Sequence, residues 1–385
     1  MMNSLPTSAL FEVDAIVDAA ERIAPGSQTQ FAFLDGLEVL CDALEHEAGC
    51  TPEGRLATHN GLVQSLVTQA RVHGQRQAHP QIAAIAIEDP VFIIGLPRTG
   101  TTLLHNLLSQ HPDLRCPQLW ELLQPAGGRD AAAQAAAAQQ AQQYVDWYYQ
   151  SAPRMPMVHP MDARRPDECQ RLLGNAFRSP IFWVRYDVPS YAAWFLGQDL
   201  RAAYQFHKTQ LQHILWRRPG APLVLKDPFH IWNLDALAAV YPKARYLFLH
   251  RDPAASVVST CGLTEVARAA RSARHDPAAI GRFWLGHIES ALARLPQLRR
   301  SVISPGAALD IRYSDLTADS AGTMERICDF LGVPMTDRAQ ANVQRFTIDN
   351  PLQKQGVHAA TAEQFDLDRD DLSSRFAAYR DRYHL

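Results

Sequence analysis

The sequence predicts an α/β fold in which a parallel sheet is flanked by helices, with an N-terminal helical extension. The apolar segments typical of buried strands are residues 91–94, 223–226, 245–249 and 308–312. Helical patterns lie between them, and strands that alternate with helices form parallel sheets built from βαβ units. We expect the α/β domain to span residues 86–385 and the extension to span residues 1–85.

The helical extension is predicted from apolar residues at helical spacing, among them Leu34, Leu37 and Leu40, within residues 7–75. Three roles stay open for it: packing on the α/β domain, shaping a substrate pocket, or forming a homodimer. Residues 130–150 are rich in Ala and Gln. Because Ala is the strongest helix former, this segment is predicted to be a long surface helix.

Residues 91–105 carry the strongest functional signal. A buried strand runs into a loop between Gly95 and Gly100, and a helix is expected to begin at Thr101 or the residue after it. Free backbone N–H groups in such a loop bind phosphate. The spacing is P-loop-like, but the P-loop motif needs Lys after the second Gly, where Thr101 stands. The positive charge is Arg98, inside the loop, so we predict a nucleotide site that binds a 5′-phosphate and does not grip a γ-phosphate.

Two more predicted strands end near side chains that are candidates for binding phosphate. The strand at residues 222–226 ends in Lys226, and the strand at residues 245–249 leads to Arg251, with Ser259 in the next helix. Ligands of open α/β sheets bind beyond the carboxyl ends of the strands. A guanidinium and a hydroxyl at this spacing can converge on one phosphate, and the alternative is a salt bridge from Arg251 to Asp252 at the helix start with an ordinary helical serine.

The segment at residues 97–102, Pro-Arg-Thr-Gly-Thr-Thr, resembles the 5′-phosphosulfate loop of sulfotransferases that use 3′-phosphoadenosine 5′-phosphosulfate (PAPS). Family members read Pro-(Lys/Arg)-Ser-Gly-Thr-Thr, so Thr99 is a departure from the pattern. The loop is similar to that of tyrosyl-protein sulfotransferases, and residues 155–169 resemble a stretch of the broad bacterial sulfotransferase subfamily. The resemblance extends over residues 90–385, with the order and spacing of the motifs preserved.

This resemblance implies PAPS as co-substrate, 3′-phosphoadenosine 5′-phosphate (PAP) as product, and no metal. The donor-binding residues that it implies are Pro97, Arg98, Thr99, Gly100, Thr101 and Thr102 for the 5′-phosphosulfate, Arg251 and Ser259 for the 3′-phosphate, Tyr313 for the adenine, and Lys354 in a closing loop. Lys226 is expected to neutralise charge on the sulfuryl group and the departing phosphate. Arg98 is expected to be a catalytic residue as well.

A base is expected to accept the proton of the acceptor hydroxyl. Cytosolic aryl and steroid sulfotransferases use a His two residues past the strand Lys, where this chain has Pro228. Tyrosyl-protein sulfotransferases use a Glu after the loop helix, and Glu121 lies at a similar distance, which makes it the first candidate. His230 is the second candidate, and His159 and Glu168 are further alternatives.

The leading hypothesis is therefore a sulfotransferase that moves a sulfuryl group from PAPS to a hydroxyl of a small, apolar acceptor. A P-loop-type kinase or nucleotide hydrolase is an alternative, with Asp227 as its candidate carboxylate, although Thr101 replaces the Lys that it needs. A non-catalytic PAP-binding protein is the other alternative.

Composition bounds the other partners. A formal net charge of −3 argues against nucleic acid as the main partner. No apolar run approaches the ~20 residues that span a bilayer, and the N-terminus lacks the pattern of a secretory signal. The six Cys are scattered without C-x-x-C spacing, which suggests neither a zinc site nor a disulfide framework. We expect a cytoplasmic protein.

Overall fold

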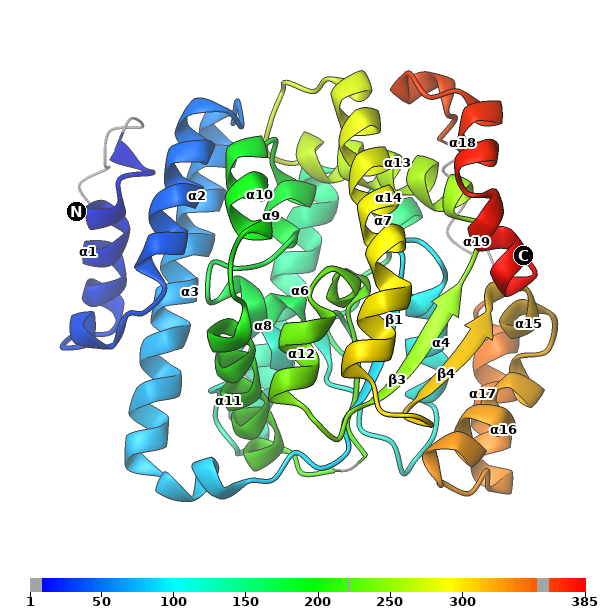
Figure 1. Ribbon diagram of the computed structural model, residues 1–385. Helices are drawn as coiled ribbons and strands as arrows, with labels where there is room; N and C mark the ends of the chain where they lie inside the picture. The colour runs from blue at the N-terminus through cyan, green and yellow to red at the C-terminus, as the bar shows by residue number, and fades with distance from the viewer. Residues whose placement is uncertain (1–8, 221, 352–359) are drawn as a thin grey trace.

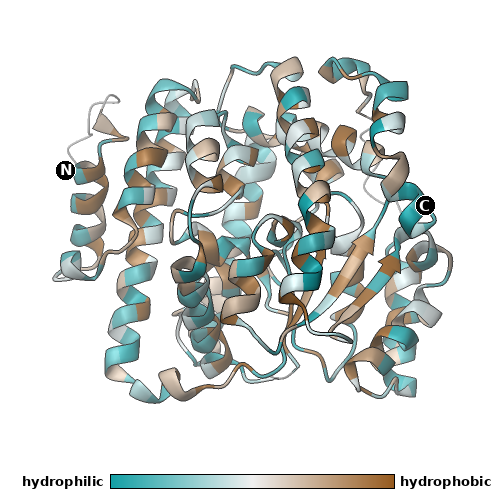
Figure 2. Ribbon diagram, viewed as in Figure 1, coloured by the Kyte–Doolittle hydropathy of each residue, from teal (hydrophilic) through white to brown (hydrophobic). Residues whose placement is uncertain are grey.

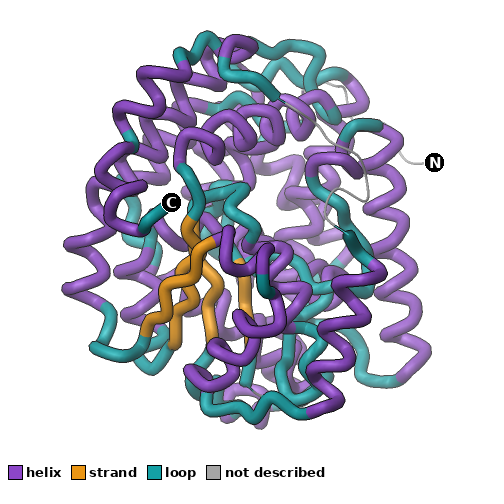
Figure 3. The backbone as a smooth tube through the Cα atoms, turned by 90° about the vertical axis from the view of Figure 1, so that its right-hand side faces the viewer, coloured by secondary structure: helices purple, strands orange, loops and turns teal. Residues whose placement is uncertain are grey.

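A four-stranded parallel sheet with the order β2-β1-β3-β4 forms the centre of the fold (Figure 1, Figure 3). The computed structural model describes residues 9–220, 222–351 and 360–385. The strands are β1 (Val91–Gly95), β2 (Val224–Lys226), β3 (Arg245–His250) and β4 (Ala308–Arg312). Each neighbouring pair is parallel, so the predicted α/β class and the strand positions are confirmed.

The two faces of the sheet bury different side chains, because successive strand residues point to opposite sides. Val91 and Ile93 pack on one face, and Phe92 and Ile94 pack on the other. The neighbouring strands β3 and β4 are largely brown, and therefore hydrophobic, in Figure 2. The first face is covered by α4 (Thr101–Leu108), α16 (Ser320–Leu331) and α17 (Asp337–Asp349). The second is covered by α11 (Arg201–Arg217), α12 (Leu234–Val240), α13 (Pro253–Ala269) and α14 (Pro277–Val302).

The topology places the carboxyl ends of three strands together. A long helical connection joins β1 to β2 at one edge of the sheet, and the chain then returns across β1 to form β3. The strand order therefore reverses beside β1, which is the place where open α/β sheets bind ligands. The ends of β1, β2 and β3 are Gly95, Lys226 and His250.

The N-terminal helices pack on the rest of the chain through the same hydrophobic cluster as the sheet. They are α1 (Val13–Ile23), α2 (Leu34–His46) and α3 (Pro52–Ala78). The α3 side chains also reach the segment around residues 175–186: Gln69 Nε2 donates to the Asn175 carbonyl at 2.7 Å, and Thr58 Oγ1 donates to the Tyr186 hydroxyl at 3.0 Å. The helix α3 therefore packs beside this segment (Figure 1).

The other helices connect or flank these layers. They are η2 (Gln28–Gln30), η3 (Pro80–Ala84), α5 (Leu119–Leu123), α6 (Ala131–Ser151), α7 (Met155–Val158), α8 (Gln170–Gly174), α9 (Ile181–Arg185), α10 (Pro189–Leu196), η4 (Pro228–Trp232), α15 (Tyr313–Ala318), η5 (Glu363–Phe365), α18 (Arg369–Arg375) and α19 (Ala377–Tyr383). The predicted Ala- and Gln-rich helix is α6, whose N-terminus Asp130 caps. Among the helices described, none has the length and hydrophobicity needed to cross a membrane.

Candidate active site

The loop between β1 and α4 turns its backbone N–H groups outward. Arg98 and Gly100 have φ angles of 66° and 94°, both in the left-handed region. The N–H groups of residues 98–103 donate to no acceptor among the described residues. A Cβ on Gly100 would lie 2.5 Å from the Tyr313 ring, so only Gly fits there. This row of free donors at a helix N-terminus fits an anionic phosphate group.

The Arg98 side chain joins this loop to α13. Its Nε donates to Ser259 Oγ at 3.1 Å, and its Nη1 donates to the Val158 carbonyl at 2.6 Å. The Ser256 hydroxyl donates to the Pro97 carbonyl and fixes the loop from the same helix. Two of the predicted phosphate-binding side chains, Arg98 and Ser259, are therefore in direct contact.

Arg251 lies beside the loop with its charge available. Its Nη1 donates to the Arg98 carbonyl at 3.1 Å, and its guanidinium lies 4.6 Å from the centre of the Tyr313 ring. No carboxylate among the described residues neutralises it. Arg251 is therefore placed to bind a second anionic group, with Tyr313 as an adjacent aromatic surface.

Lys226 brings a buried cation to the same place from the end of β2. Its side chain is 2% exposed, and its Nζ donates to Thr102 Oγ1 at 3.2 Å and to Glu168 Oε1 at 2.6 Å. The Cys169 N–H donates to the Lys226 carbonyl at 3.0 Å, which fixes the Glu168 loop against the strand end. A cation and a carboxylate thus lie together beside the loop between β1 and α4.

Glu168 is held in its ionised form by this arrangement. Burial of the Glu168 carboxyl opposes ionisation, but Lys226 and His159 act against burial and leave the pKa of Glu168 below its usual value. The Gln170 amide also donates to the carboxylate. A carboxylate that is ionised at neutral pH and partly exposed can accept a proton from a bound hydroxyl.

These groups surround a pocket of about 220 Å³. Its lining combines charged groups with apolar ones, and it includes Arg98, Gly100, Thr102, Met155, His159, Met161, Glu168, Phe229, Arg251 and Tyr313. Met side chains adapt to apolar ligands of varied shape. A sequence profile of the Sulfotransferase family matches residues 90–337, which is more than half of the chain and includes the loop, Lys226 and Arg251.

The chain belongs to the sulfotransferase family. Over 314 residues it is 24% identical to omega-hydroxy-beta-dihydromenaquinone-9 sulfotransferase Stf3 of Mycobacterium bovis, a match that covers 77% of this chain and 75% of that protein. It is also similar to protein-tyrosine sulfotransferase 1 of Mus musculus, at 26% identity over 170 residues, which are 44% of this chain and 33% of that one.

Two solved structures share the whole fold of this sulfotransferase. Sulfotransferase STF1 from Mycobacterium tuberculosis H37Rv superposes with a TM-score of 0.81 at 28% identity, covering 95% of this chain and 98% of that one. Sulfotransferase STF9 from Mycobacterium avium superposes with a TM-score of 0.84 at 24% identity, covering 96% of each chain. The sheet and the N-terminal helices therefore form one arrangement that recurs in this family.

Glu121, the first candidate for the base, does not reach the sulfotransferase pocket. Its side chain is completely buried, and it pairs with Arg115 at 2.5 Å and with Arg218 at 3.4 Å. It also accepts a hydrogen bond from the Gln118 N–H at 2.9 Å, within a capping box at the start of α5. Both carboxylate oxygens contact these partners, so the Glu121 side chain holds α5 in place, and it is not among the pocket residues.

Glu121→Ala is expected to lower the free energy of unfolding by about 3–5 kcal/mol, because it leaves Arg115 buried without its carboxylate. Urea denaturation measures this loss, with Glu38→Ala, an exposed acid on α2, as the control. Turnover per folded molecule is expected to stay near the wild-type value. A stable variant without turnover would instead make Glu121 a catalytic residue.

His230, the second candidate, is also turned away from the pocket. It is completely buried, with Nδ1 2.8 Å from the Tyr204 hydroxyl and Nε2 3.2 Å from Cys169 Sγ. Burial lowers the pKa of His230 well below its usual value, so the ring stays neutral. His159 does line the pocket, and burial likewise lowers its pKa.

Lys354 lies outside the described residues, so its predicted role stays a prediction. Among the described residues, no group of three or more His, Cys, Asp or Glu side chains is arranged to hold a metal ion. The contact of Glu168 with Lys226 could not be predicted from the spacing of motifs, because the two residues are 58 positions apart in the chain. The available signal was local: an acidic pair, Asp167-Glu168, follows a Pro in the segment that resembles the bacterial subfamily.

Proposed function

We propose that this sulfotransferase moves the sulfuryl group of PAPS to a hydroxyl of a small apolar acceptor, giving a sulfate ester and PAP. The Lys226–Glu168 pair carries the proposal, because it puts a cation and a carboxylate at the mouth of the phosphate loop. Sulfuryl transfer needs charge stabilisation on one side of the sulfur and a base on the other. Glu168 lines the pocket, and Lys226 Nζ contacts Glu168 and Thr102, which both line it.

The donor side of the site is formed by three groups of residues. The free N–H groups of residues 98–103 and the Arg98 side chain suit a 5′-phosphosulfate. Arg251 and Ser259 suit the 3′-phosphate, and the Tyr313 ring offers a face to a planar base. Lys226 is placed to stabilise negative charge on the phosphate as it leaves.

The acceptor side is where Glu168 replaces Glu121 as the proposed base. The acceptor oxygen forms a bond to sulfur while the bond from sulfur to the 5′-phosphate oxygen breaks, and the hydroxyl proton passes to Glu168. Such a transfer depends mainly on positioning and charge stabilisation, as phosphoryl transfer does. Met155, Met161 and Phe229 supply the apolar part of the acceptor pocket.

Titration calorimetry with PAP and with ATP–Mg²⁺ tests the donor assignment. We expect PAP to bind and ATP–Mg²⁺ to bind far more weakly, since Thr101 occupies the place of the P-loop Lys. Labelled PAPS offered with phenols, sterols and lipid alcohols then tests transfer. Absence of PAP binding would overturn the proposal, whatever the acceptor panel gives.

Arg251→Ala is expected to weaken PAP binding by about 2–5 kcal/mol, because one partner of a charge-assisted phosphate contact is removed. Adenosine 5′-phosphosulfate lacks the 3′-phosphate and should lose far less. Arg312→Ala is the matched control, since Arg312 ends the neighbouring strand and already pairs with Asp315 at 2.9 Å. Equal losses for both ligands would show that the 3′-phosphate does not meet Arg251.

A further inference from the structure

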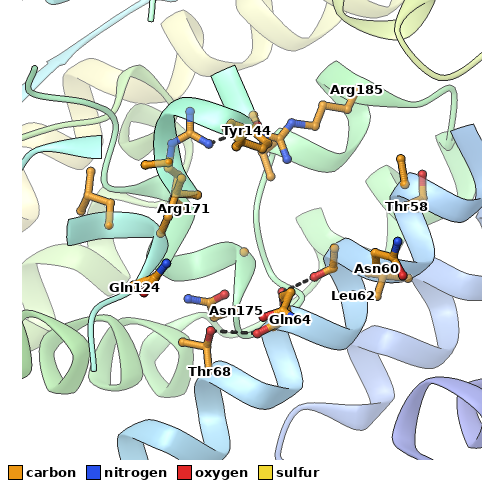
Figure 4. Close-up of a pocket in the computed structure, with 18 of the residues that line it drawn as sticks. Thr58, Asn60, Leu62, Gln64, Thr68, Gln124, Tyr144, Arg171, Asn175 and Arg185 are labelled. Carbon is orange, nitrogen blue, oxygen red and sulfur yellow. Dashed lines mark hydrogen bonds between the residues drawn. The ribbon is translucent and has the colours of Figure 1, made fainter. Parts of the chain in front are cut away.

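A second, larger cavity of about 760 Å³ adjoins the active-site pocket. It lies between α3, α6 and the α8–α9 segment (Figure 4). The residues that line both cavities are Tyr144, Arg171, Ile181 and Arg185. A molecule that enters the active site from this side therefore passes the Tyr144 hydroxyl and two guanidinium groups.

The charge of the larger cavity is unbalanced. Four of the described residues that line it are arginines. Glu53, whose side chain is exposed, is the one acidic residue among them. Arg171 is neutralised from outside the cavity, because its Nε donates to Asp167 at 3.1 Å. Other lining residues, such as Leu62, Leu122 and Phe182, are apolar.

Arg185 has no carboxylate partner among the described residues. Its Nη2 donates to the Tyr144 hydroxyl at 3.1 Å, and Arg171 approaches the same hydroxyl from the other side at 3.4 Å (Figure 4). The Tyr144 hydroxyl is neutral and engages only Nη2 of the Arg185 guanidinium, so the other N–H groups stay available to a ligand. Arg forks bind carboxylates and phosphates through two parallel hydrogen bonds.

Arg271 is a second arginine of the cavity with an unused hydrogen-bond donor, and it is more deeply buried than Arg185. It is 4% exposed, and its guanidinium lies 5.0 Å from the Trp147 ring and 4.8 Å from the Tyr148 ring. Its Nη1 has no hydrogen-bond partner within the described part of the chain. A buried donor without a partner costs free energy unless a ligand completes it.

We propose that this cavity holds the body of the acceptor and that Arg185 and Arg271 bind an anionic group on it, such as a carboxylate. The inference rests on the proposed function and narrows its acceptor class to elongated, mainly apolar molecules. The hydroxyl of such an acceptor reaches Glu168, and the acidic group stays among the arginines. Arg185 is a specificity residue in this arrangement.

The state of Tyr144 is consistent with a positive potential at the junction of the two cavities. Burial of its hydroxyl opposes ionisation, yet Arg185, Arg171 and Arg271 together lower the pKa of Tyr144 to about 8. The charges that stabilise a phenolate at this point act equally on the anion of a ligand. Asp167 is held by Arg171, so it offsets only that arginine.

The test uses ω-hydroxy fatty acids from decanoate to hexadecanoate, each paired with its methyl ester, in titration calorimetry with and without PAP. The best acid is expected to bind about 10- to 100-fold more tightly than its ester, the range of a charged hydrogen-bond pair. Arg185→Gln should bring this ratio close to one, and Arg185→Lys should keep part of it. Arg185 carries the test because it is half-buried, whereas changing Arg271 also disturbs its contacts with the rings of Trp147, Tyr148 and Tyr186.

Arg201→Gln, an exposed arginine on α11 that pairs with Asp199, controls for the loss of one positive charge. It should leave the acid-to-ester ratio unchanged. A wild-type ratio near one at every chain length, or an equal loss of acid and ester in Arg185→Gln, would overturn the inference. PAP binding in the same samples tests the proposed function separately, because the donor contacts do not include Arg185.

Discussion

Glu168→Gln is expected to lower kcat by about 10²- to 10⁴-fold while PAP binding stays near the wild-type value. The amide keeps the shape of the side chain, but it cannot accept the proton of the acceptor hydroxyl. Steady-state kinetics with phenols of graded acidity measure the effect. Because a more acidic phenol needs less help from a base, it should restore part of the lost rate.

Glu121→Gln is the matched control for this substitution. Both residues are glutamates that pair with a cation, but Glu121 contacts Arg115 away from the pocket, whereas Glu168 lines the pocket and contacts Lys226. The control should lose stability and keep its turnover. If Glu121→Gln shows the acidity-dependent rescue and Glu168→Gln keeps full activity, the proposed exchange of bases is wrong.

The parts of the site that the sequence predicted are those encoded by local pattern. A continuous apolar run predicts a buried parallel strand, and the residue that follows it must lie at the carboxyl edge of the sheet. This reasoning placed the loop after β1, Lys226 and Arg251 at one edge of the sheet without any knowledge of the packing, and the structure has them there. Each of them is within a few residues of its strand.

The proposed base could not be predicted in the same way, because its position depends on contacts between distant segments. Distance along the chain favoured Glu121, but a Glu at the third position of a helix also completes a capping box, which is a structural role. Glu168 reaches the site through the hydrogen bond between the Cys169 N–H and the Lys226 carbonyl. No periodicity in the sequence encodes that pairing.

The larger cavity could not be predicted from the sequence for the same reason. Its walls come from α3, α6 and the α8–α9 segment, which are far apart in the chain. Shaping a substrate pocket was one of the three roles that the sequence left open for the N-terminal helices, and the structure places α3 in the wall of this cavity. Arg185 and Arg271 resemble ordinary surface charges in the sequence, and only the packing shows where their charge is directed.

Lys226→Ala is expected to lower kcat by about 10²- to 10³-fold, the usual loss when one donor to a developing negative charge is removed. Unlike the loss in Glu168→Gln, this one should be rescued little by acidic phenols, since the missing charge acts on the leaving phosphate. Lys243→Ala, an exposed lysine just before β3, is the control and should keep full activity.

The pH dependence of kcat in Lys226→Ala gives the sharpest check on Glu168 as the base, because Lys226 and Glu168 form one ion pair. Burial raises the pKa of Glu168, and Lys226 is the leading influence that lowers it. Without Lys226 the Glu168 pKa should rise, so protonation would remove the base at a higher pH than in the wild type. The acidic limb of the kcat profile should therefore move to higher pH in Lys226→Ala and stay in place in Lys243→Ala. An unmoved limb would mean that the group titrating in kcat is not the carboxylate beside Lys226.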